Sequence, residues 1–190
     1  MAAHLRKCAP DRLGGKGRLP SQVLLLRVQA SGPPMYWLDL AAPATAKLKY
    51  VDMRLRHVWL ECCSHLSEFY RGRYDEVSMN ARIGDVLGGA QSRLGYVYDF
   101  GSSTELTVSR SAVIEAPSPK GVQIVARNEA PVWPCDVCEQ PATAVCTECI
   151  YEDRGFLCPA HASEHECGEE MLLPVVNSPR MGVCAYTGEP

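Results

Sequence analysis

The feature that most constrains this chain is a segment rich in cysteine and histidine. From Cys135 to Cys167 the sequence reads CDVCEQPATAVCTECIYEDRGFLCPAHASEHEC, which places six cysteines and two histidines within 33 residues. Its pairs are spaced C-x2-C, C-x2-C and C-x2-H, and two intervening residues let a tight turn aim both side chains at one ion. So short a segment buries little apolar surface, and we expect metal coordination to replace the missing core.

A structural zinc ion takes four sulfur or nitrogen ligands in a tetrahedron, so eight candidate ligands predict two structural zinc ions. The pairing of these ligands stays open. In one arrangement, which resembles the alternating order of B-box and MYND modules, the first and third pairs share an ion. The sites would then be Cys135, Cys138, Cys158 and His161, and Cys146, Cys149, His165 and Cys167. His165 and Cys167 cannot share a helical face, so either Cys167 lies past a helix end at Gly168 or Cys184 replaces it.

Two other interpretations of the cysteines are less favoured. A catalytic zinc ion keeps one position open to water, yet the segment has no H-E-x-x-H or H-x-E arrangement. The other interpretation is that the cysteines form disulfides, which persist in oxidising compartments and are rare in the cytosol. The N-terminal residues have no apolar signal region, and no run approaches the roughly 18–20 apolar residues that span a bilayer, so we expect a cytoplasmic protein with no membrane partner.

Charge divides the chain into two blocks. Residues 1–128 carry 17 basic and 11 acidic residues, whereas residues 129–190 carry 2 and 11. Opposite balances indicate a boundary, and the Pro-rich NEAPVWP stretch fits a hinge there. We predict a flexible basic tail over residues 1–20, an α+β domain over 21–128, and a treble-clef-like or B-box-like zinc module over 129–170. The last segment, 171–190, is expected to pack back on the first domain and to bury Val175, Val176 and Val183.

Hydrophobic periodicity predicts the elements of the first domain. Strands are expected at 23–30, 35–41, around 65–72, 93–100, 105–113 and 121–128, with a short helix near 81–87. The main helix is expected over Thr45–Cys62, with Thr45 as its N-cap. Its apolar face would be formed by Leu48, Val51, Leu55, Val58, Trp59 and Cys62. Tyr96, Tyr98 and Phe100 should share one face of a strand, and Asp99 should accept backbone hydrogen bonds in the turn that follows.

Three stretches, VWLECCSHLSEF, GYVYDFGSSTEL and LLPVVNSPRMGVCAYTG, resemble the plasmid pRiA4b ORF-3-like family, specifically its members with a C-terminal zinc segment. The resemblance covers roughly residues 20–190. It implies an α+β fold and zinc, and no established biochemical role. Ser102 and Ser103 stand where many members have Asp and another polar residue, so the resemblance brings no catalytic residue to this chain.

Three function classes follow from the sequence. The favoured one is a non-enzymatic, zinc-stabilised binding protein with a protein partner. A nucleic-acid-binding accessory protein of a mobile element, using the basic tail and helix, is the alternative. The third is an enzyme with a thiol–imidazole site at Cys62, Cys63 and His65, although Cys62 on the helix face and His65 after the helix end also fit a purely structural role. Arg180 is expected to pair with acidic groups of the zinc module.

Overall fold

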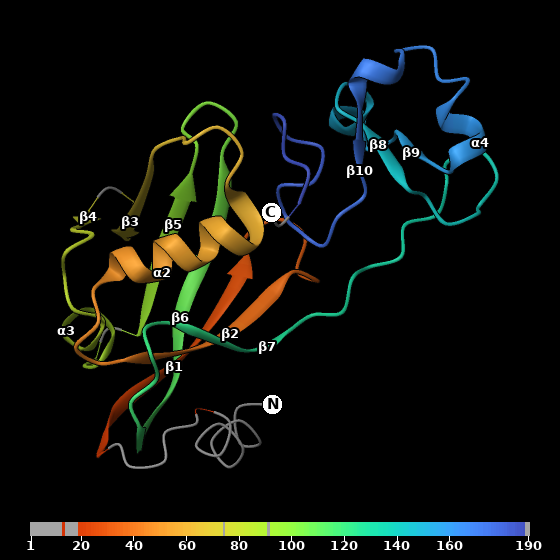
Figure 1. The fold of residues 1–190 in the computed structure, drawn as a ribbon. Coiled ribbons are helices and arrows are strands. Elements are labelled where there is room, and N and C mark those ends of the chain that lie inside the picture. The colour runs from red at the N-terminus through yellow and green to blue at the C-terminus, as the bar shows by residue number, and fades with distance from the viewer. Residues whose placement is uncertain (1–12, 14–18, 74, 91, 189–190) are drawn as a thin grey trace. The chain divides into compact units, whose positions relative to one another are not determined.

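The computed structural model describes residue 13 and residues 19–73, 75–90 and 92–188, so most of the basic tail expected over residues 1–20 lies outside the described part. Contacts divide the chain into two compact units, both drawn in Figure 1. The first comprises Met1–Leu55 and Leu66–Asn128, and the second comprises Arg56–His65 and Glu129–Pro190. The segment Arg56–His65 therefore groups with the C-terminal residues and interrupts the first unit in sequence.

The first unit is built on a seven-stranded antiparallel sheet in the order β4-β3-β5-β6-β1-β2-β7 (Figure 1). The strands are β1 (Pro20–Ala30), β2 (Trp37–Pro43), β3 (Ser67–Arg71), β4 (Asp75–Val77), β5 (Arg93–Tyr98), β6 (Thr104–Pro117) and β7 (Gln123–Arg127). Its helices are α2 (Leu48–Leu55) and α3 (Ile83–Leu87). This mixture of one main helix with antiparallel strands is the α+β class that the sequence predicts.

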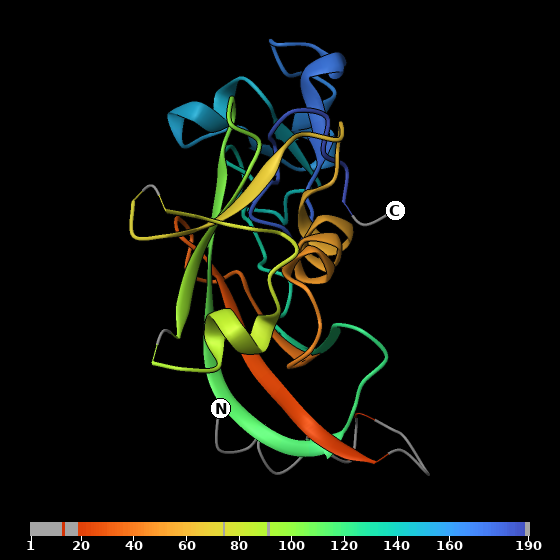
Figure 2. The ribbon, with the colours of Figure 1, turned by 90° about the vertical axis from the view of Figure 1, so that its left-hand side faces the viewer.

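The core of the first unit lies between α2 and the sheet. Figures 1 and 2 show α2 lying across one face of the sheet, and its residues Leu48, Val51 and Leu55 are fully buried, as their helical spacing predicts. In β1 the four consecutive residues Val23–Leu26 are all buried, so both faces of this strand are covered. A smaller apolar cluster is formed by Leu13, Val23, Leu25, Ala41, Ala112 and Ala116.

The start of α2 differs from the expectation. The helix begins at Leu48, so the prediction that Thr45 is its N-cap is wrong. The backbone N–H groups of Leu48 and Lys49 donate instead to the carbonyls of Ala81 and Met79, at 3.0 and 2.9 Å. Because a distant part of the chain satisfies these first-turn donors, no side-chain cap is needed.

The end of α2 also differs. A π-helix, η1 (Arg56–Leu60), replaces the expected continuation to Cys62, and it is closed by the Glu61 N–H donating to the Arg56 carbonyl at 2.8 Å. The wider turn rotates the side chains relative to an α-helix. Val58 and Trp59 are buried as predicted, Leu60 is buried as well, and Cys62 lies beyond the helix end.

The β5–β6 connection corrects one further expectation. Asp99 has a left-handed backbone conformation, with φ 66°, and its side-chain Oδ1 accepts the N–H of Gly101 at 3.0 Å, as its place in a turn predicts. The left-handed residue ends the strand at Tyr98 and breaks its alternation. Phe100 is therefore 55% exposed and does not continue the buried face of Tyr96 and Tyr98.

The second unit contains a small three-stranded antiparallel sheet in the order β10-β8-β9. Its elements are β8 (Ala144–Cys146), η2 (Cys149–Glu152), β9 (Phe156–Leu157), α4 (Pro159–Ala162), η3 (Glu169–Met171) and β10 (Leu172–Pro174). Trp133 of the expected hinge stacks on Phe156, with ring centroids 4.6 Å apart, so this part of NEAPVWP belongs to the folded unit. Among the described residues, no helix combines the length and apolar character needed to cross a bilayer.

Candidate metal centres

The first centre, named quartet A here, gathers Cys135, Cys138, Cys158 and His161, whose ligand atoms lie within 4.8 Å of one another. The Cys138 and Cys158 sulfurs are 3.7 Å apart. The His161 Nδ1 lies 3.4 Å from the Cys158 sulfur and 3.5 Å from the Cys135 sulfur. Four donors converge on one point, so quartet A could hold a metal ion.

Tight turns position the donors of quartet A. The Cys135 N–H donates to the Gln140 carbonyl at 2.7 Å, and Glu139 has a left-handed φ of 59°, so the loop between the first two cysteines folds back on itself. Cys158 precedes α4, and Pro159 occupies the first turn of this helix. Backbone N–H groups there have no acceptor within the helix, so proline, which has no N–H, costs no hydrogen bond. One turn of α4 then brings His161 beside Cys158.

The second centre, quartet B, gathers Cys146, Cys149, His165 and Cys167. The Cys149 sulfur lies 3.6 Å from the His165 Nε2 and 3.8 Å from the Cys167 sulfur. Because α4 ends at Ala162, His165 and Cys167 both lie in the turns after it, where their spacing of two is no obstacle. Quartets A and B are the two groups that the alternating arrangement of ligand pairs requires.

A glycine makes room for quartet B. Gly155 has φ +104°, and a Cβ built there would come within 2.8 Å of the Cys149 Cβ and 3.2 Å of the Cys146 Cβ. Its backbone N–H donates to the Asp136 side chain, and its carbonyl accepts the Cys146 N–H at 2.9 Å. The β8–β9 connection therefore packs its backbone directly against two donors, which only glycine permits.

Backbone hydrogen bonds favour the thiolate form of some of the cysteines: they lower the pKa of Cys135 and Cys158 in quartet A and of Cys146 in quartet B. Burial raises the pKa of Cys135, but backbone N–H groups of its own turn and of Cys158, together with His161, outweigh that effect and lower the pKa to about 6. Burial likewise opposes ionisation of Cys146, but backbone N–H groups, that of Cys149 foremost, lower its pKa to about 7. The Cys158 and Cys135 sulfurs raise the pKa of His161. Since metal ligands are the thiolate and the neutral imidazole, a metal ion competes with protons at these groups.

A third group, cluster C, gathers Cys62, Cys63, His65 and Cys184 within the second unit. The Cys184 sulfur lies 3.5 Å from the Cys63 sulfur and 3.6 Å from the His65 Nε2. Cys184, expected as a substitute for Cys167, thus stands in a different group, and Cys167 itself belongs to quartet B. The sequence placed the cysteines and histidine of residues 62–65 together, but nothing in their local spacing indicated Cys184 as their neighbour.

The C-terminal segment 171–188 groups with the second unit. Val175, Val176 and Val183 are half-buried rather than buried. Arg180 is fully buried, and its Nε donates to the Cys62 sulfur at 3.3 Å.

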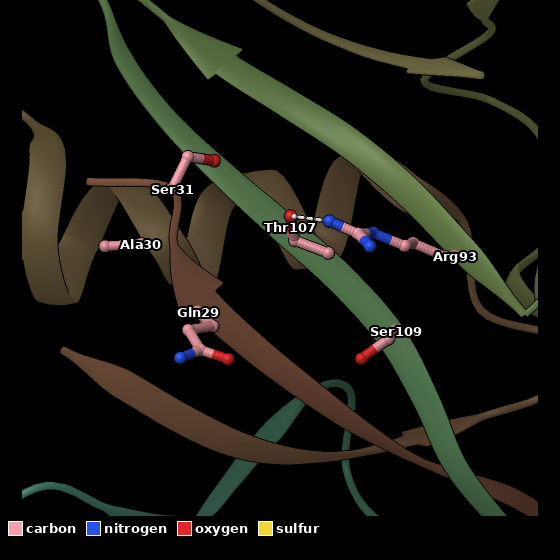
Figure 3. A pocket seen from close by; sticks show the side chains of 6 residues that line it. All are labelled: Gln29, Ala30, Ser31, Arg93, Thr107 and Ser109. Atoms are coloured by element: carbon pink, nitrogen blue, oxygen red, sulfur yellow. Dashed lines mark hydrogen bonds between the residues drawn. The ribbon is translucent and has the colours of Figure 1, made fainter. Parts of the chain in front are cut away.

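The first unit carries a shallow polar depression of about 340 Å³ on its sheet. It is lined by Gln29, Ala30, Ser31, Arg93, Thr107 and Ser109. Figure 3 shows Arg93 of β5 and Thr107 of β6 directed toward one another, and Arg93 donates to the Thr107 hydroxyl at 3.1 Å. The lining offers one cation with hydroxyl and amide groups, a set suited to hydrogen bonding and without a carboxylate or imidazole for acid–base chemistry.

Comparison with known proteins gives a likeness of fold and no family. No family model matches the chain, and no curated protein matches it. A crystal structure of a protein of unknown function from Methanosarcina mazei Go1 is similar, with a TM-score of 0.50 and 19% sequence identity. The match covers 57% of this chain and 70% of the other. At this identity the likeness extends to the fold alone.

Proposed function

We propose that this chain is a non-enzymatic, zinc-stabilised binding protein in which quartets A and B each hold a structural zinc ion. The observation that carries the proposal is that each quartet already supplies four sulfur and nitrogen donors. Four protein ligands complete a zinc tetrahedron and leave no position for water or substrate, whereas catalytic zinc keeps one position open.

The distances support zinc as the metal. A tetrahedron with Zn–S near 2.3 Å and Zn–N near 2.0 Å places sulfurs about 3.8 Å apart and sulfur about 3.5 Å from nitrogen. The sulfur–sulfur distances are 3.7 Å in quartet A and 3.8 Å in quartet B, and the sulfur–nitrogen distances run from 3.4 to 3.6 Å. Thiolate-rich donor sets also select zinc over magnesium and calcium, which prefer oxygen ligands.

We also propose that the chain is related to the plasmid pRiA4b ORF-3-like proteins. The α+β fold of the first unit supports this relation, as does the turn that the YDFG sequence forms after β5. Two of the three resembling stretches, the one around Trp59 and the one around Ser178, are in direct contact: the Ser178 hydroxyl donates to the Trp59 carbonyl at 2.6 Å.

Exposed apolar side chains on the second unit support a protein partner. Val137, at the tip of the loop between Cys135 and Cys138, is 65% exposed, and Tyr151 in η2 is 70% exposed. Each lies within two residues of a cysteine of quartet A or B, so a bound zinc ion would hold its turn rigid. Large apolar groups on rigid turns lose little entropy on binding, which favours contact with a protein.

Elemental analysis of the purified full chain is expected to give at least two zinc ions per molecule. Ser163→Ala, an exposed change between the quartets, should leave this content unaltered. One ion or none per chain would contradict the two-site proposal.

The double change Val137→Ser and Tyr151→Ser is expected to abolish capture of specific partners from a cell lysate while zinc content stays unchanged. The matched control is Met53→Ser, an exposed apolar residue of α2 in the first unit. If the control loses the same partners, or if the double variant keeps them, the second unit is not the binding surface. Capture of nucleic acid with steep salt dependence would favour the nucleic-acid alternative instead.

A further inference from the structure

We propose that cluster C is a third zinc site, in which Cys62, Cys63, His65 and Cys184 bind one ion and fasten the segment after η1 to the C-terminal tail. Its donor set, three sulfurs and one imidazole nitrogen, is the same as in quartets A and B. The Cys63–Cys184 sulfur distance of 3.5 Å and the Cys184–His65 distance of 3.6 Å are close to the edges of a zinc tetrahedron.

The loop that bears three of these donors is held in place by its own contacts. Arg56 donates to the Glu61 carboxylate at 2.7 Å and to the His65 carbonyl at 2.6 Å. Glu61 in turn accepts the N–H of Ser64, a residue with a left-handed φ of 59°. These bonds tie both ends of the loop together, so its three donors are oriented without help from the metal.

The fourth donor is delivered by a segment that is anchored independently. The Ser178 hydroxyl donates to the Trp59 carbonyl at 2.6 Å, and the Tyr186 hydroxyl donates to the Val58 carbonyl at 3.4 Å. Both acceptors lie in the last turn of η1, where carbonyls lack a partner within the helix. Cys184 lies between the two anchors, so the same contacts that complete the helix end bring its sulfur to the loop.

The charge around cluster C also fits a bound zinc ion. A Zn²⁺ ion with three thiolates and a neutral imidazole carries a net charge of −1. The Arg180 guanidinium, 0% exposed, donates to the Cys62 sulfur at 3.3 Å. A buried cation is costly unless a negative group lies beside it, and N–H donors to ligand sulfurs are the usual second layer of a thiolate site.

Cluster C differs from the other two sites in its exposure. In cluster C, Cys63 and Cys184 are exposed and Cys62 is half-buried, so none of its cysteines is buried. Quartet A has two buried cysteines and one exposed one, Cys138, and both C-x2-C cysteines of quartet B are buried. A chelator reaches an exposed ion more readily, so the ion at cluster C should leave first.

The test uses the full chain, zinc-loaded under reducing conditions, with metal counted by elemental analysis and native mass spectrometry. The wild-type protein is expected to carry three ions, and Cys184→Ser and Cys63→Ser two each. His65→Cys, which keeps four donors, should retain three ions and shift the absorption of the cobalt-substituted protein toward that of an all-sulfur site. Ser178→Ala, which removes a tail anchor and no ligand, should also retain three.

Three outcomes would overturn the third site. They are a wild-type content of two ions, an unchanged content in Cys184→Ser, and a Cys63–Cys184 disulfide in protein purified with reductant and zinc. A loss of all ions in Cys184→Ser, with His65→Cys still carrying three, would support the site and show that it stabilises the whole unit. Quartets A and B are counted in the same measurement. A wild-type content of two ions that Cys184→Ser leaves unchanged rejects cluster C alone, whereas a wild-type content below two contradicts the proposed function.

Discussion

Replacing Cys158 by serine is expected to release zinc from quartet A and unfold the segment that spans residues 129–170. All of this segment is described, and its buried hydrophobic side chains other than cysteine are Ala142, Val145 and Leu157. Burying a valine or leucine contributes only about 1.5–3 kcal/mol, so these few side chains stabilise the segment weakly. Structural zinc contributes about 10–16 kcal/mol of folding free energy, more than this apolar burial together.

The variant should therefore lose the native dispersion of its amide signals over residues 129–170 and release at least one equivalent of zinc to a colorimetric chelator. Glu164→Gln, exposed in the same segment, serves as the control and should keep both zinc and fold. Full retention of metal and unchanged thermal unfolding in Cys158→Ser would show that quartet A does not bind zinc.

The second large effect is expected at Leu55, the last residue of α2, whose side chain is fully buried. Leu55→Ala removes a buried side chain and leaves a cavity, at a cost of about 2–5 kcal/mol in the free energy of unfolding. Leu55→Met keeps the volume and should cost less than about 1.5 kcal/mol. Met53→Ala, on the exposed side of the same helix, should change the free energy of unfolding by less than about 0.5 kcal/mol.

Urea unfolding of the zinc-saturated chain, monitored through hydrogen exchange of the amides in α2 and β5, measures the change in the free energy of unfolding of the first unit. The zinc content of the Leu55 variants should stay unchanged, because the metal donors belong to the other unit. A loss of less than about 0.5 kcal/mol in the free energy of unfolding for Leu55→Ala would show that the Leu55 side chain does not face the core.

The sequence predicts those features that depend on neighbours in the chain. The C-x2-C and C-x2-H pairs are short-range, so the ligand groups of quartets A and B could be proposed from spacing alone. The burial of Leu55 and Trp59 follows from helical periodicity in the same way. The first turn of α2 could not be predicted because carbonyls thirty or more residues away replace the expected Thr45 cap.

Cluster C shows the same limit more sharply. The Cys63 and Cys184 sulfurs are 3.5 Å apart but 121 positions apart in sequence. Spacing rules detect donors that share a turn, and they say nothing about a donor supplied by a remote segment. The left-handed Asp99, which turns Phe100 outward, is a local feature that alternation alone does not reveal.

The interruption of the first unit by Arg56–His65 has a consequence for how the chain acquires its structure. During synthesis this segment leaves the ribosome more than a hundred residues before Ser178 and Tyr186, whose hydroxyls bind the carbonyls at its helix end. Until those residues emerge, Val58, Trp59 and Leu60 lack part of their native packing. The nascent chain then exposes apolar side chains to which a chaperone can bind. A fragment that stops at residue 128 would keep this defect permanently, and its solubility would be poor although it contains every strand of the large sheet.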